Sequence, residues 1–160
     1  MTPIQKCVTE KNTNINPIWI MRQAGRYLPE FREIRVKNPD FIKLCLDENL
    51  SSKITLQPIN RFDFDAAIIF SDILMLPYGL GQVVRFEKGL GPKLGELDLD
   101  KLGNVNEDEF TRKLNPIYKA ISKTSINPIL KNKDLIGFVG APWTILVYMI
   151  NKMSPKKNLS

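Results

Sequence analysis

The order of apolar and amphipathic segments predicts an α/β fold built on buried parallel strands. Three short apolar runs, at residues 18–21, 66–70 and 135–140, have the length and composition of buried strands. The second run shows no alternation with polar residues, which is typical of a parallel sheet. Amphipathic segments at helical spacing separate the runs, most clearly at residues 106–125. At 160 residues the chain is long enough for one domain with a substantial core.

Composition limits the chemistry that this chain can perform. Lys and Arg number 23 against 17 Asp and Glu, and the net charge of +6 favours an anionic partner such as nucleic acid, anionic lipid or a polycarboxylate. The absence of histidine excludes acid–base catalysis by histidine and His-ligated metal sites within this chain. Cys7 and Cys45 lack CxxC spacing, which predicts free thiols in a reducing compartment. We find no segment of signal-peptide or membrane-spanning length, so we expect a soluble, cytoplasmic protein.

The first part of the chain is expected to contain one strand and three helices. In order, we expect a loose lead-in at residues 1–16, a strand at 18–21, a helix at 29–36, a helix from Asp40 through Cys45, and a helix from residue 50 or 51 to about 62. Asp40 is a suitable N-cap for the second helix, and Ser51 or Ser52 for the third. Pro58 argues against an unbroken third helix, because proline removes a backbone donor.

The second part is expected to contain a hairpin, two helices and two strands. In order, we expect a strand at 66–70, a hairpin within 79–95 with its turn at Lys88-Gly89, an amphipathic helix at 106–125 interrupted by Pro116, a loop or half-turn at 127–128, a strand at 135–140, a helix opened by Pro142 through Ile150, and a disordered tail at 152–160. Pro142 fits the first helical position, where its missing N–H costs nothing. The hairpin glycines are expected to be structural, because no Gly-Lys-Ser/Thr sequence follows them.

Two arginines follow the first apolar run. The run stops at Arg22, and Arg26 comes after a Gln-Ala-Gly segment that is expected to turn away from the strand. Two guanidinium groups held at the end of a rigid element suit the binding of carboxylates, which each can bind in bidentate fashion. The alternative is that both arginines simply solvate a loop.

Asp72 and Tyr148 are the other candidate site residues. Asp72 follows the carboxyl end of the second strand and lies between two apolar runs, where it is a helix cap, a paired core carboxylate or a site residue. Tyr148 lies on the last helix among apolar residues, where it is a core tyrosine with a satisfied hydroxyl or a site residue.

Three motifs together resemble the uroporphyrinogen decarboxylase family. Residues 18–32 resemble its N-terminal signature, and residues 68–74 and 137–144 resemble two later motifs in the same order. The resemblance implies a (β/α)8 TIM-type barrel, of which residues 1–160 would be an N-terminal half with a small β-hairpin insertion. It also implies removal of the four acetate carboxyls of uroporphyrinogen III to give coproporphyrinogen III, in haem and chlorophyll biosynthesis. The enzyme is expected to be a homodimer without metal or organic cofactor, nucleic acid or membrane partner.

The resemblance also assigns roles to individual residues. Its substrate-binding segment falls on Arg22, Gln23, Ala24, Gly25 and Arg26. Its essential aspartate falls on Asp72, its active-site tyrosine on Tyr148, and a further substrate contact on Phe41. We expect Asp72 to face the pyrrole N–H groups and stabilise the protonated ring, with Tyr148 bonding to Asp72 or to a substrate carboxylate. Arg22 is expected to position a water or a substrate acid, because arginine is a poor proton donor at neutral pH.

Length separates this chain from a complete barrel. A full (β/α)8 barrel takes roughly 250 residues, so the family's later serine or threonine and histidine contacts have no counterpart here. We therefore expect a decarboxylase that is active only with its remainder. The alternatives are a truncated non-catalytic remnant and a half-barrel that needs a second polypeptide. A corrinoid-linked methyltransferase fits less well, because such enzymes use a Cys/His zinc site, and the Arg-Gln-Ala-Gly-Arg segment argues against it.

Overall fold

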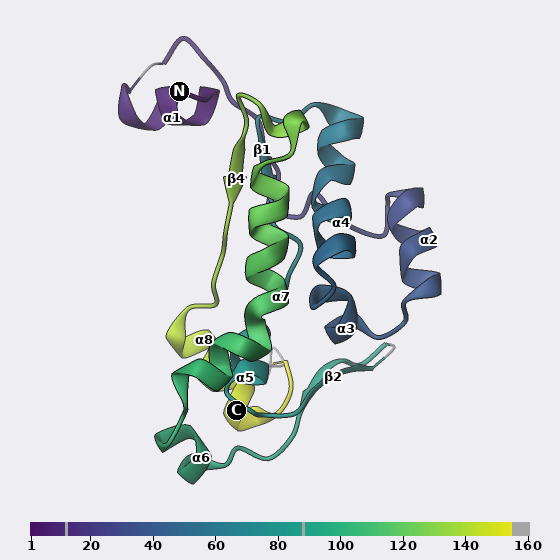
Figure 1. Cartoon of the computed structure of the whole chain (residues 1–160), viewed down its shortest axis with the longest axis vertical. Helices are drawn as coiled ribbons and strands as arrows, with labels where there is room; N and C mark the ends of the chain where they lie inside the picture. The colour runs from purple at the N-terminus through teal and green to yellow at the C-terminus, as the bar shows by residue number, and fades with distance from the viewer. Residues whose placement is uncertain (12, 88, 155–160) are drawn as a thin grey trace, which may run out of the picture.

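The protein is a mixed α/β molecule in which two long helices pack beside a short parallel sheet (Figure 1). The computed structural model describes residues 1–11, 13–87 and 89–154. In chain order the elements are α1 (Pro3–Thr9), α2 (Pro29–Lys37), α3 (Phe41–Cys45), α4 (Glu48–Phe62), β1 (Ala66–Ile68), α5 (Met75–Gly79), β2 (Val84–Glu87), β3 (Gly91–Leu94), α6 (Leu99–Gly103), α7 (Glu107–Ser125), the 3-10 helix η1 (Pro128–Leu130), β4 (Asp134–Ile136) and α8 (Pro142–Asn151). Helix α4 contacts α2, α3, α7 and β1, so it forms the centre of the packing.

The two apolar runs predicted as parallel strands do pair in parallel. Strand β1 pairs with β4 in the register Ala66 to Asp134 and Ile68 to Ile136, and one further backbone bond joins Ile69 to Ile136. Both strands are shorter than predicted, since the run at 66–70 leaves the ladder after Ile69. Strands β2 and β3 form a separate antiparallel pair at the predicted hairpin. Lys88, half of its predicted turn, lies outside the described residues.

The predicted strand at residues 18–21 is wrong for this structure. One backbone bond joins the segment to Asp65, the residue before β1, from Asp65 N to Ile18 O, and the residues are not in a strand. All four side chains are exposed. A strand needs a continuous ladder of backbone partners, and among the described residues this segment has one backbone–backbone bond, while Ile18 N and Ile20 N donate to side chains.

The helices largely follow the prediction, with corrections at their ends and prolines. Asp40 caps α3 as expected, with Oδ1 accepting from Lys43 N at 3.1 Å. Helix α4 begins earlier than predicted and is capped by Asp47 rather than by a serine. Pro58 and Pro116 both lie inside continuous helices, so the predicted interruption of α7 is wrong. The packing of α4 against α7 outweighs the local cost of each proline.

Three short helices were not predicted. Helix α1 lies within the segment expected to be a loose lead-in, and it starts with a capping box between Thr2 and Gln5. Helices α5 and α6 follow the second strand and the hairpin, and Asp98 caps α6. At the other end, the predicted tail begins with ordered contacts, because Met153 bridges to Lys93 and Lys152 pairs with Glu96. The rest of that tail, 155–160, lies outside the described residues.

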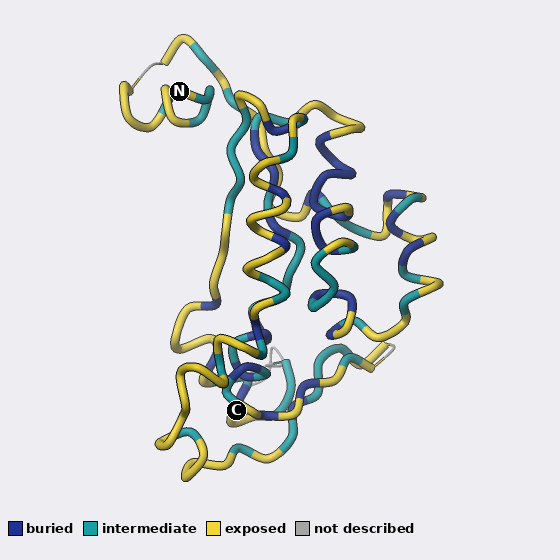
Figure 2. Tube along the Cα trace, in the orientation of Figure 1, coloured by how far each residue is buried: buried dark blue, intermediate teal, exposed yellow. Residues whose placement is uncertain are grey.

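Burial is concentrated in α4, β1 and the segments around them (Figure 2). One apolar cluster joins α3, α5, α7 and α8 with the β2–β3 hairpin, and a second joins α2 and α3 with α4. Phe70, just after β1, packs against both clusters. Among the described residues, no helix has the length and apolar character needed to cross a membrane.

Candidate functional site

The candidate site lies at the carboxyl end of β1, where Phe70 joins the neighbouring helices. Its ring contacts Phe31 of α2 and Phe41 of α3 edge-on, each with ring centroids 5.8 Å apart. Such pairs favour the edge-to-face arrangement found here. Because Phe70 comes two residues before Asp72, this packing fixes the point at which the aspartate leaves the core.

Two buried hydroxyl groups of α4 hold the backbone of Phe70. Phe70 N donates to Thr55 Oγ1 at 2.9 Å, and Ser51 Oγ donates to Phe70 O at 2.7 Å. Both polar groups of Phe70 are therefore satisfied where the chain leaves the β1–β4 ladder. Sequence reasoning assigned Ser51 to a helix cap and gave Thr55 no role. The signal available was a pair of hydroxyl residues one helical turn apart on a buried face.

Asp72 begins α5 by holding the chain in a tight turn. Its Oδ1 accepts from Leu74 N at 2.8 Å, and its backbone oxygen accepts from Met75 N at 3.1 Å. Burial raises the pKa of Asp72, and the bond from Leu74 N opposes that rise in part. Within the described residues, Asp72 Oδ2 has no hydrogen-bond partner. Asp72 thus caps the turn with Oδ1, while its Oδ2 has no partner in the described residues. The aspartate can therefore cap a helix and also serve a binding site.

Cys45 lies within electrostatic reach of Asp72. Burial is the main cause that raises the pKa of the Cys45 thiol, and the negative charge of Asp72 raises it further. Cys45 is fully buried, so it is a protonated core thiol rather than a nucleophile.

The arginine turn is built around Gln23, which is 1% exposed. Gln23 Nε2 donates to Ala66 O at 3.0 Å, Gln23 Oε1 accepts from Ile20 N at 3.2 Å, and the Tyr27 hydroxyl donates to Gln23 O. The Gln23 side chain thus attaches the turn to the start of β1. Its polar atoms are used inside the protein, which sequence reasoning did not foresee.

Arg22 and Arg26 remain at the surface of this turn, and both are exposed. In the described residues neither guanidinium forms an ion pair or a hydrogen bond. The Arg26 carbonyl accepts from Arg32 Nη1 at 2.8 Å, which holds the backbone of the turn. Ala24 packs against the second apolar cluster together with Phe70, so the turn and the Asp72 segment share one support. The structure does not bring the two arginines into contact with Asp72.

Phe41 and Tyr148 both border the first apolar cluster, which also contains Leu74. Phe41 is half-buried. Its ring centroid lies 4.6 Å from that of Phe86 and 5.5 Å from Cζ of the Arg35 guanidinium, which lies over the ring. The Tyr148 hydroxyl lies 3.4 Å from Ser154 Oγ. Of the two partners predicted for this hydroxyl, Asp72 is not contacted in the described residues, and a substrate carboxylate stays a prediction.

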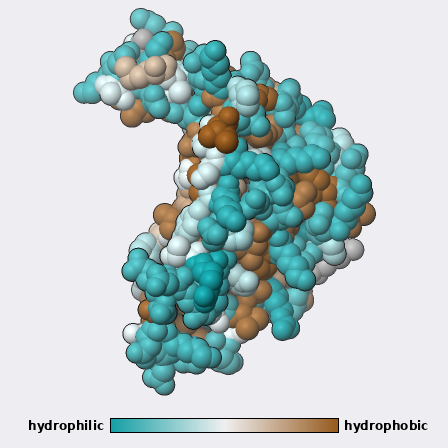
Figure 3. Space-filling model, viewed as in Figure 1, coloured by the Kyte–Doolittle hydropathy of each residue, from teal (hydrophilic) through white to brown (hydrophobic). Residues whose placement is uncertain are grey.

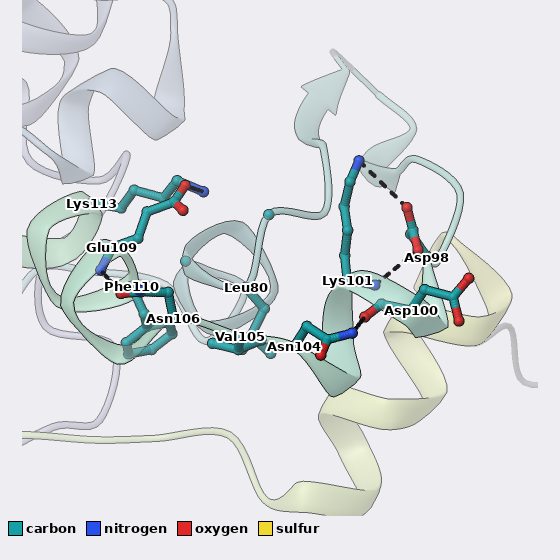
Figure 4. A pocket seen from close by; sticks show the side chains of 12 residues that line it. Leu80, Asp98, Asp100, Lys101, Asn104, Val105, Asn106, Glu109, Phe110 and Lys113 are labelled. Atoms are coloured by element: carbon teal, nitrogen blue, oxygen red, sulfur yellow. Dashed lines mark hydrogen bonds and ion pairs between the residues drawn. The ribbon is translucent and has the colours of Figure 1, made fainter.

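A separate groove of about 660 Å³ contains none of the predicted site residues (Figure 4). It lies between the end of α5, α6 and the first turns of α7. Its cations are already neutralised, since Lys113 Nζ lies 2.9 Å from Glu109 and Lys101 Nζ lies 3.4 Å from Asp98. A groove with paired charges offers little attraction to a polycarboxylate, so we do not assign the site here. In the described parts of the chain, no group of three His, Cys, Asp or Glu side chains is arranged to hold a metal ion.

Comparison with known proteins gives a consistent result. The sequence model of the family "Uroporphyrinogen decarboxylase (URO-D)" matches residues 1–159. A uroporphyrinogen decarboxylase of Campylobacter jejuni is 48% identical over 149 residues, which cover 92% of this chain and 44% of that protein. Those of Chelativorans sp. and Brucella anthropi are 46% and 47% identical over 134 residues, covering 84% of this chain and 39% of each relative. The chain thus spans about two fifths of the length of these relatives.

Proposed function

This chain belongs to the uroporphyrinogen decarboxylase family, and from that premise we propose that it carries part of the site that converts uroporphyrinogen III to coproporphyrinogen III. The observation that carries the proposal is that the arginine turn and the segment before Asp72 pack on the same apolar cluster. Phe70 and its partners hold both the arginine turn and the segment that presents Asp72. The reaction would be a decarboxylation, and the protein a carboxy-lyase of haem biosynthesis.

Arg22 and Arg26 are proposed to bind substrate carboxylates. Uroporphyrinogen carries eight carboxylates, and a guanidinium binds a carboxylate through two parallel N–H bonds. Both guanidiniums lack internal partners within the described residues and sit on a turn fixed by Gln23. The role of Gln23 and Ala24 is then to hold that turn, and Gly25 lies within it. The carbonyl oxygens of Gln23, Gly25 and Arg26 already accept bonds inside the protein, so the backbone N–H groups of the turn are the ones proposed to serve substrate.

Asp72 is proposed to stabilise the cation that forms during decarboxylation. Protonation of a pyrrole carbon turns the ring into an electron sink, and loss of CO₂ from the attached acetate sends the electron pair into the ring and leaves an exocyclic methylene. That methylene then takes up a proton and the ring carbon gives one up, which restores the pyrrole and leaves a methyl group. A carboxylate beside the pyrrole N–H groups would favour this cationic state, and removal of a comparable fixed group costs about 10²–10³ in kcat. The free Oδ2 of Asp72 and its partly buried position support this role. Arg22 would position the proton donor.

Phe41 and Tyr148 are proposed to form the wall beside Asp72. Both pack on the apolar cluster that includes Leu74, two residues beyond the aspartate. Phe41 would offer an aromatic edge to the macrocycle. Tyr148 would contact substrate only if its hydroxyl exchanged its Ser154 neighbour for a substrate carboxylate.

The complete site is proposed to belong to a (β/α)8 barrel. The parallel pair β1–β4, separated by helices and by the β2–β3 hairpin as an insertion, supports this arrangement. The complete protein would act as a cytoplasmic homodimer, as the family resemblance implies.

The test is an assay for coproporphyrinogen in anaerobic extracts, with product measured by chromatography after oxidation. The chain is assayed alone and co-expressed with the part of the Campylobacter jejuni relative that follows the matched segment. We expect turnover only with both parts. In the active pair, Asp72→Asn should lower kcat by about 10²–10³, and Arg26→Ala should mainly raise KM.

Asp98→Asn is the matched control, since this aspartate caps α6 away from the proposed site. It should leave kcat and KM unchanged. Full turnover by Asp72→Asn would contradict the role given to the aspartate, and turnover by the chain alone would contradict the need for a second part.

A further inference from the structure

Phe70 is the residue at which the chain leaves the parallel sheet. Among the described residues, the bond from Ile69 N to Ile136 O is the last backbone bond of the β1–β4 pairing. The N–H and C=O groups of Phe70 are bonded instead by two side chains of α4, with Phe70 N donating to Thr55 Oγ1 at 2.9 Å and Ser51 Oγ donating to Phe70 O at 2.7 Å. Two helix side chains thus take the place of a neighbouring strand at this one residue.

The two hydroxyl groups form a closed network that water does not reach. Besides accepting from Phe70 N, Thr55 Oγ1 donates its only hydrogen to Ser51 O at 2.8 Å. Figure 3 shows largely hydrophilic side chains over α4 and α7, but Ser51 and Thr55 do not reach this surface, since each is 0% exposed. Loss of either hydroxyl would leave a polar group of Phe70 without its partner, and a buried polar group without a partner is costly. The Phe70 peptide is therefore held in one position.

This peptide lies close to Asp72 along the chain. Only Ser71 separates the two residues, and two residues of chain span at most about 7 Å. The Asp72 carboxylate bonds only to Leu74 N within the described residues, so its own turn does not tie it to the sheet or to α4. The position of Asp72 relative to the core is therefore set through Phe70, whose backbone is held by Thr55 and Ser51.

We propose that Thr55 and Ser51 are positioning residues for the decarboxylation, because they hold the Phe70 peptide so that Asp72 presents Oδ2 to the pyrrole N–H groups. Neither hydroxyl touches substrate. Stabilisation of a transition state by a fixed charge requires that the charge be in place beforehand, and a displacement of about 1 Å can cost about 10²-fold in rate. The inference rests on the proposed function for the reaction, whereas the contacts of α4 with Phe70 do not depend on it.

A second pair of buried hydroxyls supplies matched controls. Thr124 of α7 is 0% exposed and Ser52 of α4 is 4% exposed, and Thr124 Oγ1 donates to Ser52 Oγ at 2.9 Å. This pair joins α4 to α7 and does not bond to the Phe70 peptide, whose two partners are Thr55 and Ser51. Threonine to valine and serine to alanine changes therefore remove the same atoms from similarly buried places in both pairs.

The first measurement is kcat and KM in the active pair formed with the remaining part of the Campylobacter jejuni relative. Thr55→Val should lower kcat about 10–100-fold and change KM less than about threefold, since the hydroxyl acts on the transition state through Asp72. Thr55→Ser keeps the acceptor for Phe70 N and should restore kcat to within about threefold of the original chain. Ser52→Ala and Thr124→Val should leave kcat within about twofold, even where urea denaturation shows the same loss of stability as in Thr55→Val. An unchanged kcat in Thr55→Val, or an equal loss in Thr124→Val, would overturn the proposal.

The second measurement is amide hydrogen exchange by NMR in the chain alone, at Leu74 N, which donates to Asp72 Oδ1. Relative to the amides of α7, this exchange should accelerate at least about tenfold in Thr55→Val and stay unchanged in Thr124→Val. Ser51→Ala leaves the bond from Phe70 N in place and should accelerate it in the same direction, so it supplies the result if Thr55→Val does not fold. An active pair without turnover would reject the proposed function, while acceleration confined to the Thr55 and Ser51 variants would still support the positioning of Asp72. Unaltered exchange at Leu74 in both variants would overturn it.

Discussion

Asp72 combines a fixed position with a carboxylate that burial disfavours. The pKa of Asp72 is raised mainly by loss of solvent, and the single bond from Leu74 N offsets only part of this. Ionisation therefore costs more in the folded chain than in the unfolded one. A charge maintained at a cost to stability is typical of groups that serve a site.

Asp72→Asn is expected to stabilise the folded chain at neutral pH. Asparagine keeps the Oδ1 acceptor for Leu74 N and removes the buried charge. Because burial raises the pKa of Asp72 in the folded chain above that in the unfolded chain, the gain should be absent at pH values below the unfolded pKa, where both states are protonated. It should grow as the pH rises through the folded pKa. Urea denaturation from pH 3 to 8 measures it.

Asp98→Asn is the control, because the folded chain shifts the pKa of Asp98 in the direction opposite to that of Asp72. Bonding to Lys101 N is the main cause that lowers the pKa of Asp98, so its charge favours the folded state above the unfolded pKa. This variant should show no gain at neutral pH. Equal effects of the two substitutions at pH 7 would contradict the account of Asp72.

The sequence suggested candidate residues for the site but not the contacts that hold them. Sequence reasoning named Arg22, Arg26 and Asp72 as site residues, and those roles stay predictions. The structure adds that Ala24 of the arginine turn and Phe70, two residues before Asp72, pack on one apolar cluster. The internal role of Gln23 could not be foreseen, because its partner Ala66 O lies 43 residues away in the sequence. Nothing in the residues near Tyr148 indicates which way its hydroxyl points.

Gly140 allows α8 to begin against the segment that follows Asp72. A Cβ at this position would lie 2.4 Å from Ile145 Cδ1, 2.7 Å from Ile145 Cγ1 and 3.2 Å from Ile73 Cβ. Ile145 is only 3% exposed, so its side chain has little room to move. The glycine in this motif therefore serves a close approach between two elements.

Gly140→Ala is expected to destabilise the chain by about 1–3 kcal/mol through overpacking. Gly137→Ala is the matched control, because its added Cβ would meet no heavy atom within 4 Å, and its effect should stay within about 0.5 kcal/mol. Urea denaturation of both variants measures the difference. Similar free energies of unfolding for the two variants would show that a Cβ at position 140 is accommodated beside Ile145 without overpacking.

At the scale of the molecule, α1 is attached to the rest of the fold through few contacts (Figure 1). It has no buried residue, and Thr2 Oγ1 and Gln5 Nε2 both donate to the carboxylate of Asp134 at the start of β4. An element held by a few polar contacts at the surface opens more readily than the core.

Asp134→Ala is expected to release α1 without unfolding the rest. Amide exchange at residues 3–9 should accelerate, while the free energy of unfolding changes by less than about 1 kcal/mol. Hydrogen-exchange mass spectrometry with a parallel urea titration tests both. Asp108→Ala on α7 is the control and should leave exchange at residues 3–9 unchanged. Unaltered exchange in Asp134→Ala would show that other contacts hold α1.

The sequence alone indicated the family and most of the local elements. Periodicity and caps predicted α2, α3, α7 and α8, and apolar runs predicted buried parallel strands at β1 and β4. These features depend on residues that are close in the chain. Only the tertiary structure decided that Gln23 is internal, that Phe70 joins the clusters, and that residues 18–21 lack strand partners. Each of these depends on backbone and side-chain partners far away in the sequence, or on a neighbouring strand that the described residues do not provide.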